Sequence, residues 1–422
     1  MTTDAQDKRA GTGFTRVEPA VDIPAMEKGI LELWRRTRAF EESVLRRPAD
    51  KEYIFYDGPP FPTGSPHYGN LLAGVIKDMV PRYWTMRGYR VERRFGWDTH
   101  GLPIEMEVEK RLGISGPKAI AEYGVDRFNE AARSVVQANT ENWEVLTERI
   151  GRWVDFENDY KTLDPEYMET VWWVFKQLWD KGLVYKDFKV LPYSWGAATP
   201  LSNFEANKDY RDVEDPSITV RLEVLQDGGP VKAGDFLLIW TTTPWTLPGN
   251  LAVAVGEDIA YSRIRGDAQN GGDGHYWIAA ARAATVFGDD PNVVGEAKGS
   301  EMLGVPYRPP FDHFIAERES GAFRIISSPE VTVEEGTGLV HMAPAYGEAD
   351  FYALKTAGIE SLVDPVDAEG NFTEQVPQVA GLNVKVADDT LIELLRESGN
   401  LVRSDRITHS YPFCERTGTP LI

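Results

Sequence analysis

Hydrophobic residues in the first half of the chain recur mostly at the spacing of α-helices. Apolar positions three and four residues apart predict helices over residues 23–44, 71–86, 104–112, 126–150 and 165–181. Two short aromatic and β-branched runs, residues 52–56 and 89–95, predict strands among the first of these helices. Helices that alternate with strands in this way are typical of a parallel sheet covered by helices, so we expect an α/β domain.

The pattern changes after about Ser202, where short β-rich runs alternate with turns rich in Gly, Pro and Asp. Two extended segments, residues 182–185 and 190–193, lead into this region, and residues 231–234 and 266–274 are expected to be surface loops. We therefore expect a second, separate domain with a barrel-like β structure. Its strands are predicted near residues 218–224, 235–240, 251–255, 259–264, 276–279, 323–327 and 338–341.

The composition is that of a globular protein with more than one core. The chain has 422 residues, of which 42% are hydrophobic, and only its first 22 residues are expected to be loosely ordered. The start holds no apolar signal core, and no later apolar run reaches membrane-spanning length. The single cysteine, Cys414, can form neither an internal disulfide nor a cysteine-rich zinc site. We expect a cytoplasmic protein that has no membrane contact and binds no zinc.

The net charge of −21 argues against a large nucleic-acid partner, because binding to phosphates requires Lys and Arg. Total charge does not describe a local patch, however. Basic residues cluster at Lys77, Arg82, Arg87, Arg90, Arg93 and Arg94. Two interpretations of this cluster remain open, a solvated helix face with a strand edge, or a contact with phosphate or RNA.

The most informative stretch, residues 57–70, reads Asp-Gly-Pro-Pro-Phe-Pro-Thr-Gly-Ser-Pro-His-Tyr-Gly-Asn between a predicted strand and a helix that opens at His67. The positive end of the helix dipole and the free N–H groups of the turn suit an anion such as a triphosphate. His67 can donate to phosphate oxygens, and Gly69 leaves room for a nucleotide. Asn70 can also donate, but it cannot become cationic. The simpler interpretation of the Gly-Pro-Pro run is a rigid turn.

This stretch resembles the His-x-Gly-His-type signature of class I aminoacyl-tRNA synthetases, with Asn70 at its last position. Three further motifs follow in the order of the isoleucyl branch of that family: Gly-Trp-Asp-Thr-His-Gly-Leu-Pro-Ile-Glu at residues 96–105, Pro-Leu-Ser-Asn-Phe-Glu at 200–205, and Trp-Thr-Thr-Thr-Pro-Trp-Thr-Leu-Pro at 240–248. Residues 336–351 match the second motif of the family's editing domain. The first four of these motifs, in the family's order, already resemble the isoleucyl-tRNA synthetases closely, and residues 336–351 are a fifth match.

The resemblance implies an α/β fold, the first half of a class I Rossmann-like nucleotide-binding domain with an inserted β-barrel-like editing domain. The implied parts are an amino-terminal extension and helix (1–45), the first half of the catalytic domain (46–200), the editing domain (201–406) and a return segment (407–422). The family's Lys-Met-Ser-Lys-Ser loop does not occur in the sequence. We therefore expect an amino-terminal fragment that is inactive in synthesis by itself.

For the synthetic site, the resemblance implies that His67 and Asn70 contact the phosphates of ATP and that Gly69 lets its adenine or ribose approach. Pro59 would line the isoleucine pocket, and Asp98 would pair with the α-ammonium group, although an Asp at this place is often only a helix cap. The implied partners are isoleucine, ATP with Mg²⁺, and tRNA(Ile), bound by a monomer.

A hydrophobic pocket cannot strongly reject a smaller amino acid, and isoleucyl-tRNA synthetase is itself the standard example, preferring isoleucine to valine by only about 150-fold. A hydrolytic second site is therefore expected. The Thr-rich segment 241–248 offers several hydroxyls on a tight turn, able to hold a terminal ribose and a water, with Thr241, Thr242 and Thr243 as the candidate residues. By resemblance, Asn250 lies close to this segment. Asp350 would bind the α-ammonium group of a wrongly attached amino acid, and His341 would wall the side-chain pocket. The simpler interpretations are plain β-structure for the Thr run and a solvated helix residue for Asp350.

Two other functions remain open. The chain could be a free-standing hydrolase that acts in trans on Val-tRNA. It could also be an inactive synthetase-like binding module, since Asn70 and the Pro62-Thr63 pair depart from the family's usual residues.

Overall fold

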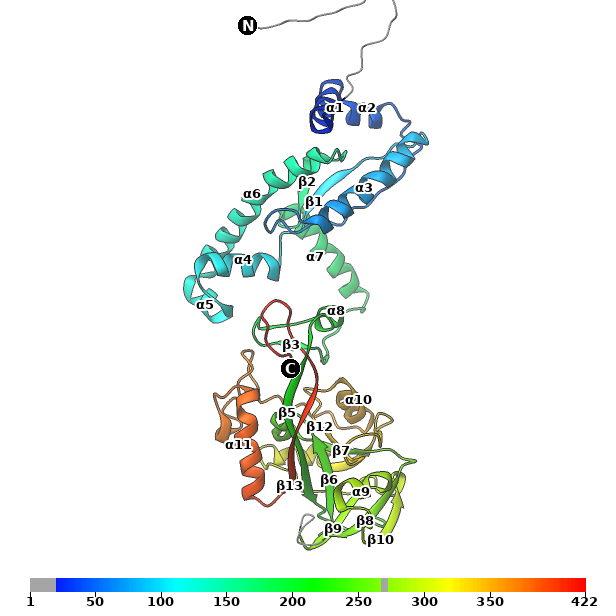
Figure 1. Ribbon diagram of the computed structural model, residues 1–422, viewed down its shortest axis with the longest axis vertical. Coiled ribbons are helices and arrows are strands. Elements are labelled where there is room, and N and C mark those ends of the chain that lie inside the picture. The colour runs from blue at the N-terminus through cyan, green and yellow to red at the C-terminus, as the bar shows by residue number, and fades with distance from the viewer. Residues whose placement is uncertain (1–19, 267–271) are drawn as a thin grey trace, which may run out of the picture. The chain divides into compact units, whose positions relative to one another are not determined.

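The structure is a computed structural model that describes residues 20–266 and 272–422. The chain forms two compact units, Met1–Tyr185 and Lys186–Ile422 (Figure 1). The expected loose segment over residues 1–22 lies almost wholly outside the described residues, as does the middle of the expected loop at 266–274. The domain limits implied by the resemblance stay predictions.

The first unit combines helices with a two-stranded parallel sheet. Strand β1 (Arg94–Trp97) pairs in parallel with β2 (Asp155–Lys161), and the chain between them is helical. A crossover of this kind is required between parallel strands, and it confirms the α/β character of this half. The helices are α1 (Ile23–Thr37), α2 (Ala39–Leu45), α3 (Tyr68–Met86), α4 (Leu102–Leu112), α5 (Gly116–Tyr123), α6 (Val125–Arg149) and α7 (Pro165–Asp180).

Three predictions for this unit are wrong in detail. The strand expected at residues 89–95 begins only at Arg94 and runs to Trp97. The helix expected over residues 23–44 is broken into two, because Arg38 adopts a left-handed conformation with φ of 50°. The strand expected at residues 52–56 is only a single parallel bridge between Glu52 and Arg90, and Ile54 and Tyr56 are exposed. A run with strand-like composition needs a partner along its length, and here the pairing ends beside Arg90.

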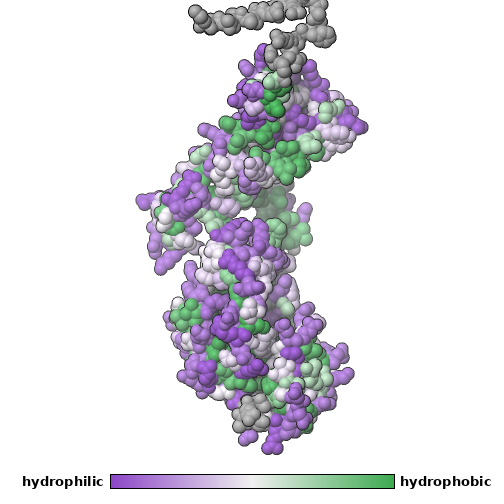
Figure 2. Space-filling view, viewed as in Figure 1, coloured by the Kyte–Doolittle hydropathy of each residue, from purple (hydrophilic) through white to green (hydrophobic). Residues whose placement is uncertain are grey.

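The first unit also carries apolar side chains on its surface (Figure 2). On α7, the residues Trp172, Trp173 and Trp179 are all more than half exposed. Exposed apolar faces of this kind usually mark a surface that binds something else. In the described part of the chain, no helix is long and apolar enough to span a bilayer.

The second unit is built on a six-stranded mixed sheet in the order β10-β8-β9-β6-β5-β13. Its central pairs are antiparallel except for β6 with β9. The inner half of β5 and most of β6 are buried, because hydrophobic clusters cover both faces of the sheet here. The strands are β5 (Tyr210–Glu223), β6 (Phe236–Thr241), β8 (Ala260–Gly266), β9 (Gly274–Ala279), β10 (Val293–Lys298) and β13 (Leu401–Pro412).

A three-stranded sheet, in the order β11-β7-β12, shares the core of the six-stranded one. All four residues of β7 are buried, as expected for a run of Ala and Val at the centre of a sheet. Its strands are β7 (Ala252–Val255), β11 (Arg324–Ser327) and β12 (Val340–Met342). Strand β12 carries His341, one of the residues predicted from the sequence to wall a side-chain pocket.

The expected barrel is not found. Strands β10 and β13 form opposite edges of the six-stranded sheet, and no pairing between them closes it among the described residues. The barrel was inferred from short strands and turns alone, and this composition does not fix how the last strand pairs. Residues 231–234, expected as a surface loop, include Val231, which is fully buried in the core.

Short strands and helices complete the second unit. They are β3 (Tyr193–Ser194), β4 (Thr199–Pro200), α8 (Asn203–Ala206), α9 (Ala283–Phe287), α10 (Glu348–Thr356) and α11 (Val384–Glu397), with 3₁₀ turns η1 (Pro244–Gly249), η2 (Ala280–Arg282), η3 (Gly299–Glu301), η4 (Ile315–Ser320) and η5 (Pro377–Val379).

Candidate functional site

The turn before α3 brings together the residues predicted to bind phosphate. Nδ1 of His67 accepts from the N–H of Gly69 at 3.1 Å, and Oδ1 of Asn70 accepts from the N–H of His67 at 3.1 Å. This reciprocal pair is a capping box. Because Nδ1 is the acceptor, a neutral His67 carries its proton on Nε2. The box therefore does not use Nε2–H of His67 or the amide N–H groups of Asn70, and both can donate at the positive end of the helix.

Gly69 has a local reason to be glycine. A Cβ built at this position would lie 2.9 Å from Cε1 of His67, closer than such carbon atoms approach one another. A side chain here would push the imidazole out of its capping position. The glycine therefore protects the geometry of His67, whether or not it also lets a nucleotide approach.

The predicted isoleucine-binding residues lie on two segments that are bonded to each other. Asp98 follows β1 directly, and its N–H donates to the carbonyl of Pro60 at 2.9 Å, next to Pro59. The turn is also tied to α3, because Nζ of Lys77 donates to the carbonyl of Gly58 at 2.8 Å. The Gly-Pro-Pro run is thus a fixed turn, and its position beside Asp98 is compatible with a ligand role as well.

The basic cluster serves the first unit's own structure in part. Arg82 forms an ion pair with Asp78 at 2.5 Å, and buried Arg93 donates to the hydroxyl of Thr85 at 2.6 Å. Burial lowers the pKa of Arg93 to about 10. Side chains or backbone oxygens of the first unit also bond Lys77, Arg87, Arg90 and Arg94. The structural interpretation fits Arg82 and Arg93, and a phosphate or RNA contact by the others stays a prediction.

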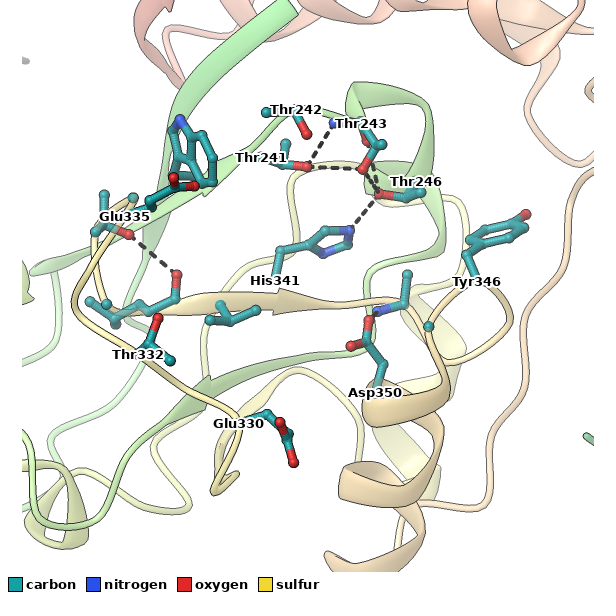
Figure 3. Close-up of a pocket in the computed structure, with 18 residues that line it drawn as sticks. Thr241, Thr242, Thr243, Thr246, Glu330, Thr332, Glu335, His341, Tyr346 and Asp350 are labelled. Carbon is teal, nitrogen blue, oxygen red and sulfur yellow. Dashed lines mark hydrogen bonds between the residues drawn. The ribbon is translucent and has the colours of Figure 1, made fainter. Parts of the chain in front are cut away.

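In the second unit, a pocket of about 380 Å³ brings together the predicted editing residues other than Asn250 (Figure 3). The Thr segment forms one side, β12 and α10 form another, and the chain before β12 forms the third. The pocket is lined by Trp240, Thr241, Thr242, Thr243, Thr246, Glu330, Thr332, Glu335, Gly336, Thr337, Gly338, Leu339, Val340, His341, Ala343, Tyr346, Gly347 and Asp350.

The Thr segment is a tight turn rather than a continued strand. β6 ends at Thr241, and η1 begins three residues later. The Thr241 hydroxyl accepts from the N–H of Thr243 at 3.0 Å, and the Thr246 hydroxyl donates to the carbonyl of Thr243 at 2.9 Å. This geometry gathers several hydroxyl groups at one edge of the pocket, with Thr242 among the lining residues.

His341 is held as a neutral imidazole in a single tautomer. Burial lowers its pKa to about 4, so it carries no charge at neutral pH. Nδ1 lies 2.8 Å from Nδ2 of Asn250, an amide donor, and must therefore accept. The proton then sits on Nε2, which lies 2.9 Å from the hydroxyl of Thr246. Both ring nitrogens are engaged within the protein, so His341 forms a fixed wall and is not free to act as an acid or base.

Asp350 lies in the first turn of α10, where its carboxylate faces the pocket (Figure 3). Its Oδ2 accepts from the N–H of Ala343 at 2.8 Å. Burial raises the pKa of Asp350 to about 6, and the hydrogen bond opposes this only in part. Burial disfavours the ionised form of this carboxylate. A nearby ammonium group would favour the ionised form again, so the site suits a cationic ligand. The solvated helix residue considered above does not describe it.

Sequence reasoning missed several residues of this pocket. Thr246 lies within the predicted Thr-rich segment but was not named as a site residue, although its distance of three residues from Thr243 is the spacing of a 3₁₀ turn. Tyr346 packs edge-on against Trp245, with 4.8 Å between ring centroids. Asn250 does not line the pocket but lies behind His341, almost completely buried. No group of three or more His, Cys, Asp or Glu among the described residues is placed to hold a metal ion, and the absence of zinc stays a prediction.

A buried carboxylate of α11 supports the Thr turn from behind. Oδ1 of Asp388 accepts from the N–H of Trp245, the second residue of η1, at 2.9 Å. Asp388 is 4% exposed, and burial raises its pKa to about 7, while nearby Lys385 opposes the shift. The carboxylate thus bonds the turn that presents Thr246.

We expect Asp388→Asn to raise the melting temperature at pH 8 and to remove a pH dependence of stability. The folded-state pKa of Asp388 lies above its unfolded value, so the stability linked to its protonation is complete below about pH 4 and is lost as the pH rises through 7. Asn retains an oxygen acceptor for Trp245. Thermal melts of both proteins from pH 5 to 8 measure the effect, and Asp389→Asn on the same helix is the control. If the melting temperatures of the wild type and of Asp388→Asn change with pH in the same way from pH 5 to 8, the prediction is wrong.

Comparison with known proteins identifies the family of the chain. The family of class I tRNA synthetases for I, L, M and V matches residues 29–375. The chain is similar to the isoleucine–tRNA ligases of Bdellovibrio bacteriovorus (50% identity, covering 97% of this chain and 38% of that protein) and Chlamydia pneumoniae (47% identity, 94% and 37%). It is also similar to the isoleucine–tRNA ligase of Mycobacterium tuberculosis (47% identity, 100% and 40%). The chain thus spans less than half the length of these relatives.

Two solved structures share weaker similarity. One is the crystal structure of GlLeuRS-CP1, with 13% identity, a TM-score of 0.35, and coverage of 45% of this chain and 99% of that chain. The other is a ternary complex of Agrobacterium radiobacter K84 agnB2 LeuRS with tRNA and LeuAMS, with 16% identity, a TM-score of 0.38, and coverage of 94% and 50%. TM-scores this low carry no conclusion. The family match covers most of the chain and therefore supports a conclusion. The chain belongs to the class I tRNA synthetases of the isoleucine, leucine, methionine and valine group.

Proposed function

We propose that the protein carrying this chain is an isoleucine–tRNA ligase that also removes valine from tRNA(Ile) by hydrolysis. The observation that carries the hydrolytic half is the pocket in which threonine hydroxyls, a neutral histidine and the carboxylate of Asp350 meet. The names of the similar proteins support the ligase half. As a translation enzyme, it would work in the cytoplasm as a monomer, with ATP, isoleucine and tRNA(Ile) as partners.

In synthesis, the carboxylate of isoleucine attacks the α-phosphate of ATP, which arrives with Mg²⁺, and pyrophosphate leaves. Catalysis here is mostly positioning and charge stabilisation. Nε2–H of His67 and the amide of Asn70 would donate to phosphate oxygens, because the capping box leaves these donors available. The carboxylate of Asp98 would pair with the α-ammonium group of isoleucine beside the Pro59 turn.

In hydrolysis, Asp350 would bind the α-ammonium group of the attached amino acid, and the hydroxyls of Thr241 to Thr243 would hold the terminal ribose and a water. His341 would limit the size of the side chain that enters. The neutral state of His341 suits this role, since a charged ring would not accommodate an apolar side chain.

The two alternatives are less well supported. An inactive binding module has no need for a carboxylate such as Asp350, whose burial is unfavourable unless a ligand compensates for it. A free-standing hydrolase would use the same pocket, but it does not account for the capping box of His67 and Asn70.

The test is to assay the full-length protein for isoleucine-dependent ATP–pyrophosphate exchange and for deacylation of Val-tRNA(Ile) and Ile-tRNA(Ile). We expect isoleucine-dependent ATP–pyrophosphate exchange. We also expect rapid deacylation of Val-tRNA(Ile) but not of Ile-tRNA(Ile). Replacement of His341 by alanine should increase deacylation of Ile-tRNA(Ile) at least roughly tenfold, because a larger side chain then fits. His313→Ala, a histidine packed among phenylalanines outside the pocket lining, is the control. If His341→Ala leaves Ile-tRNA(Ile) intact, the histidine does not wall the pocket.

A further inference from the structure

A fully buried tyrosine lies behind the histidine wall. Tyr307 does not line the pocket, and its ring packs edge-on against Phe323, with 6.4 Å between centroids. Its hydroxyl lies 2.7 Å from Oδ1 of Asn250. Burial holds the pKa of Tyr307 well above its ordinary value, so the hydroxyl keeps its proton and can donate.

The surrounding atoms fix the direction of each hydrogen bond. Nδ2 of Asn250 donates to the carbonyl of Ala252 at 3.0 Å, and a carbonyl can only accept. The amide nitrogen therefore faces Ala252 and His341, and the amide oxygen faces Tyr307. The order of donation runs from Tyr307 to Asn250, from Asn250 to Nδ1 of His341, and from Nε2 of His341 to Thr246.

We propose that Tyr307 is a positioning residue of the hydrolytic pocket. By holding the amide of Asn250, it fixes the tautomer and the placement of His341, and so it determines which side chains the pocket admits. This inference rests on the proposed function, because Tyr307 can affect selection only if the pocket hydrolyses aminoacyl-tRNA. Tyr307 itself does not contact the substrate.

Removal of the hydroxyl leaves Asn250 with two unfavourable choices. In Tyr307→Phe, its Oδ1 either stays buried without this donor, or the amide turns round and presents the oxygen to His341. The turned amide would force the proton of His341 onto Nδ1 and would bring two oxygens together at Ala252. Either way, His341 is held less firmly. We expect deacylation of Ile-tRNA(Ile) to rise roughly fivefold, the usual weight of one hydrogen bond, with deacylation of Val-tRNA(Ile) changed by less than about twofold.

The test measures selectivity and the ¹⁵N signals of the imidazole in the same full-length proteins. Wild type should show His341 protonated on Nε2 only, from pH 6 to 8, and Tyr307→Phe should shift or broaden these signals. Tyr276→Phe is the control, because it removes the hydroxyl of another fully buried tyrosine outside the pocket lining. That hydroxyl donates to the carbonyl of Gly272 and accepts from Arg221.

The outcomes separate the two proposals. If wild type does not deacylate Val-tRNA(Ile), the proposed function fails, whereas the ¹⁵N signals still report on the hydrogen-bond order. If wild-type His341 is protonated on Nδ1, or if Tyr307→Phe keeps both the wild-type signals and the wild-type selectivity, the role of Tyr307 is refuted. A wild-type His341 protonated on Nδ1 refutes the proposed hydrogen-bond order even if the variant does not fold.

Discussion

Replacement of Asp350 by alanine should abolish deacylation of Val-tRNA(Ile) and leave isoleucine activation by the full-length protein intact. The carboxylate is the group in the pocket best placed to pair with an α-ammonium group, and without it that charge would enter a half-buried site unpaired. No proton transfer is required of Asp350, so the loss would arise from a misplaced ester. The measurement is the first-order loss of valine from purified Val-tRNA(Ile).

The pH profile gives this prediction a second readout. The pKa of Asp350 is raised to about 6, and only the ionised form binds an ammonium group, so kcat/KM for deacylation should fall as the pH drops through 6. Glu348→Ala, which removes an exposed carboxylate from the same turn of α10, is the control and should behave as wild type. If Asp350→Ala clears Val-tRNA(Ile) at the wild-type rate, the editing site lies elsewhere.

The second large effect is expected at His67. We expect His67→Ala to lower isoleucine-dependent ATP–pyrophosphate exchange at least roughly tenfold, with a smaller effect on isoleucine binding, because phosphate contacts strengthen in the transition state. The alanine also removes the N-cap of α3. His67→Asn separates the two effects, since Asn is a good N-cap but places no imidazole N–H at the phosphates.

Three results are informative for His67. Low exchange in both variants supports the phosphate contact, and low exchange in the alanine variant alone would show that only capping matters. Normal exchange in His67→Ala would refute the assignment altogether. His100→Ala, an exposed histidine outside the capping box, is the control.

The candidate sites were predictable from sequence where the residues belong to contiguous motifs. The Thr run, His341 and Asp350 were identified this way, and the structure brings them into one pocket. Tyr307 could not be found, because its contact with Asn250 joins residues 57 positions apart and no pattern along the chain records it. The same limit explains Asp388, which reaches Trp245 from another helix.

Secondary structure was predictable where one local preference dominated. The helix that begins after His67 was found because apolar spacing and an N-terminal turn agree. The prediction of a strand at residues 52–56 was wrong, because the composition of a segment does not show whether a neighbouring strand pairs with it. The break at Arg38 was missed because a non-glycine residue with positive φ has no sequence signal of its own. Closure of the β domain depended on the pairing of β10 and β13, which lie far apart in the chain.

The long ribbon of β5 and β13 has an evolutionary consequence. Tyr210 pairs with Pro412, so the chain enters and leaves most of the second unit at adjacent positions although about two hundred residues lie between them. A domain whose two ends lie side by side can be inserted into a single surface loop of another domain at little entropic cost. It can also be lost without disrupting the core of that other domain. Under the function proposed above, proofreading could therefore be gained, exchanged or discarded as a cassette with little change to the rest of the protein.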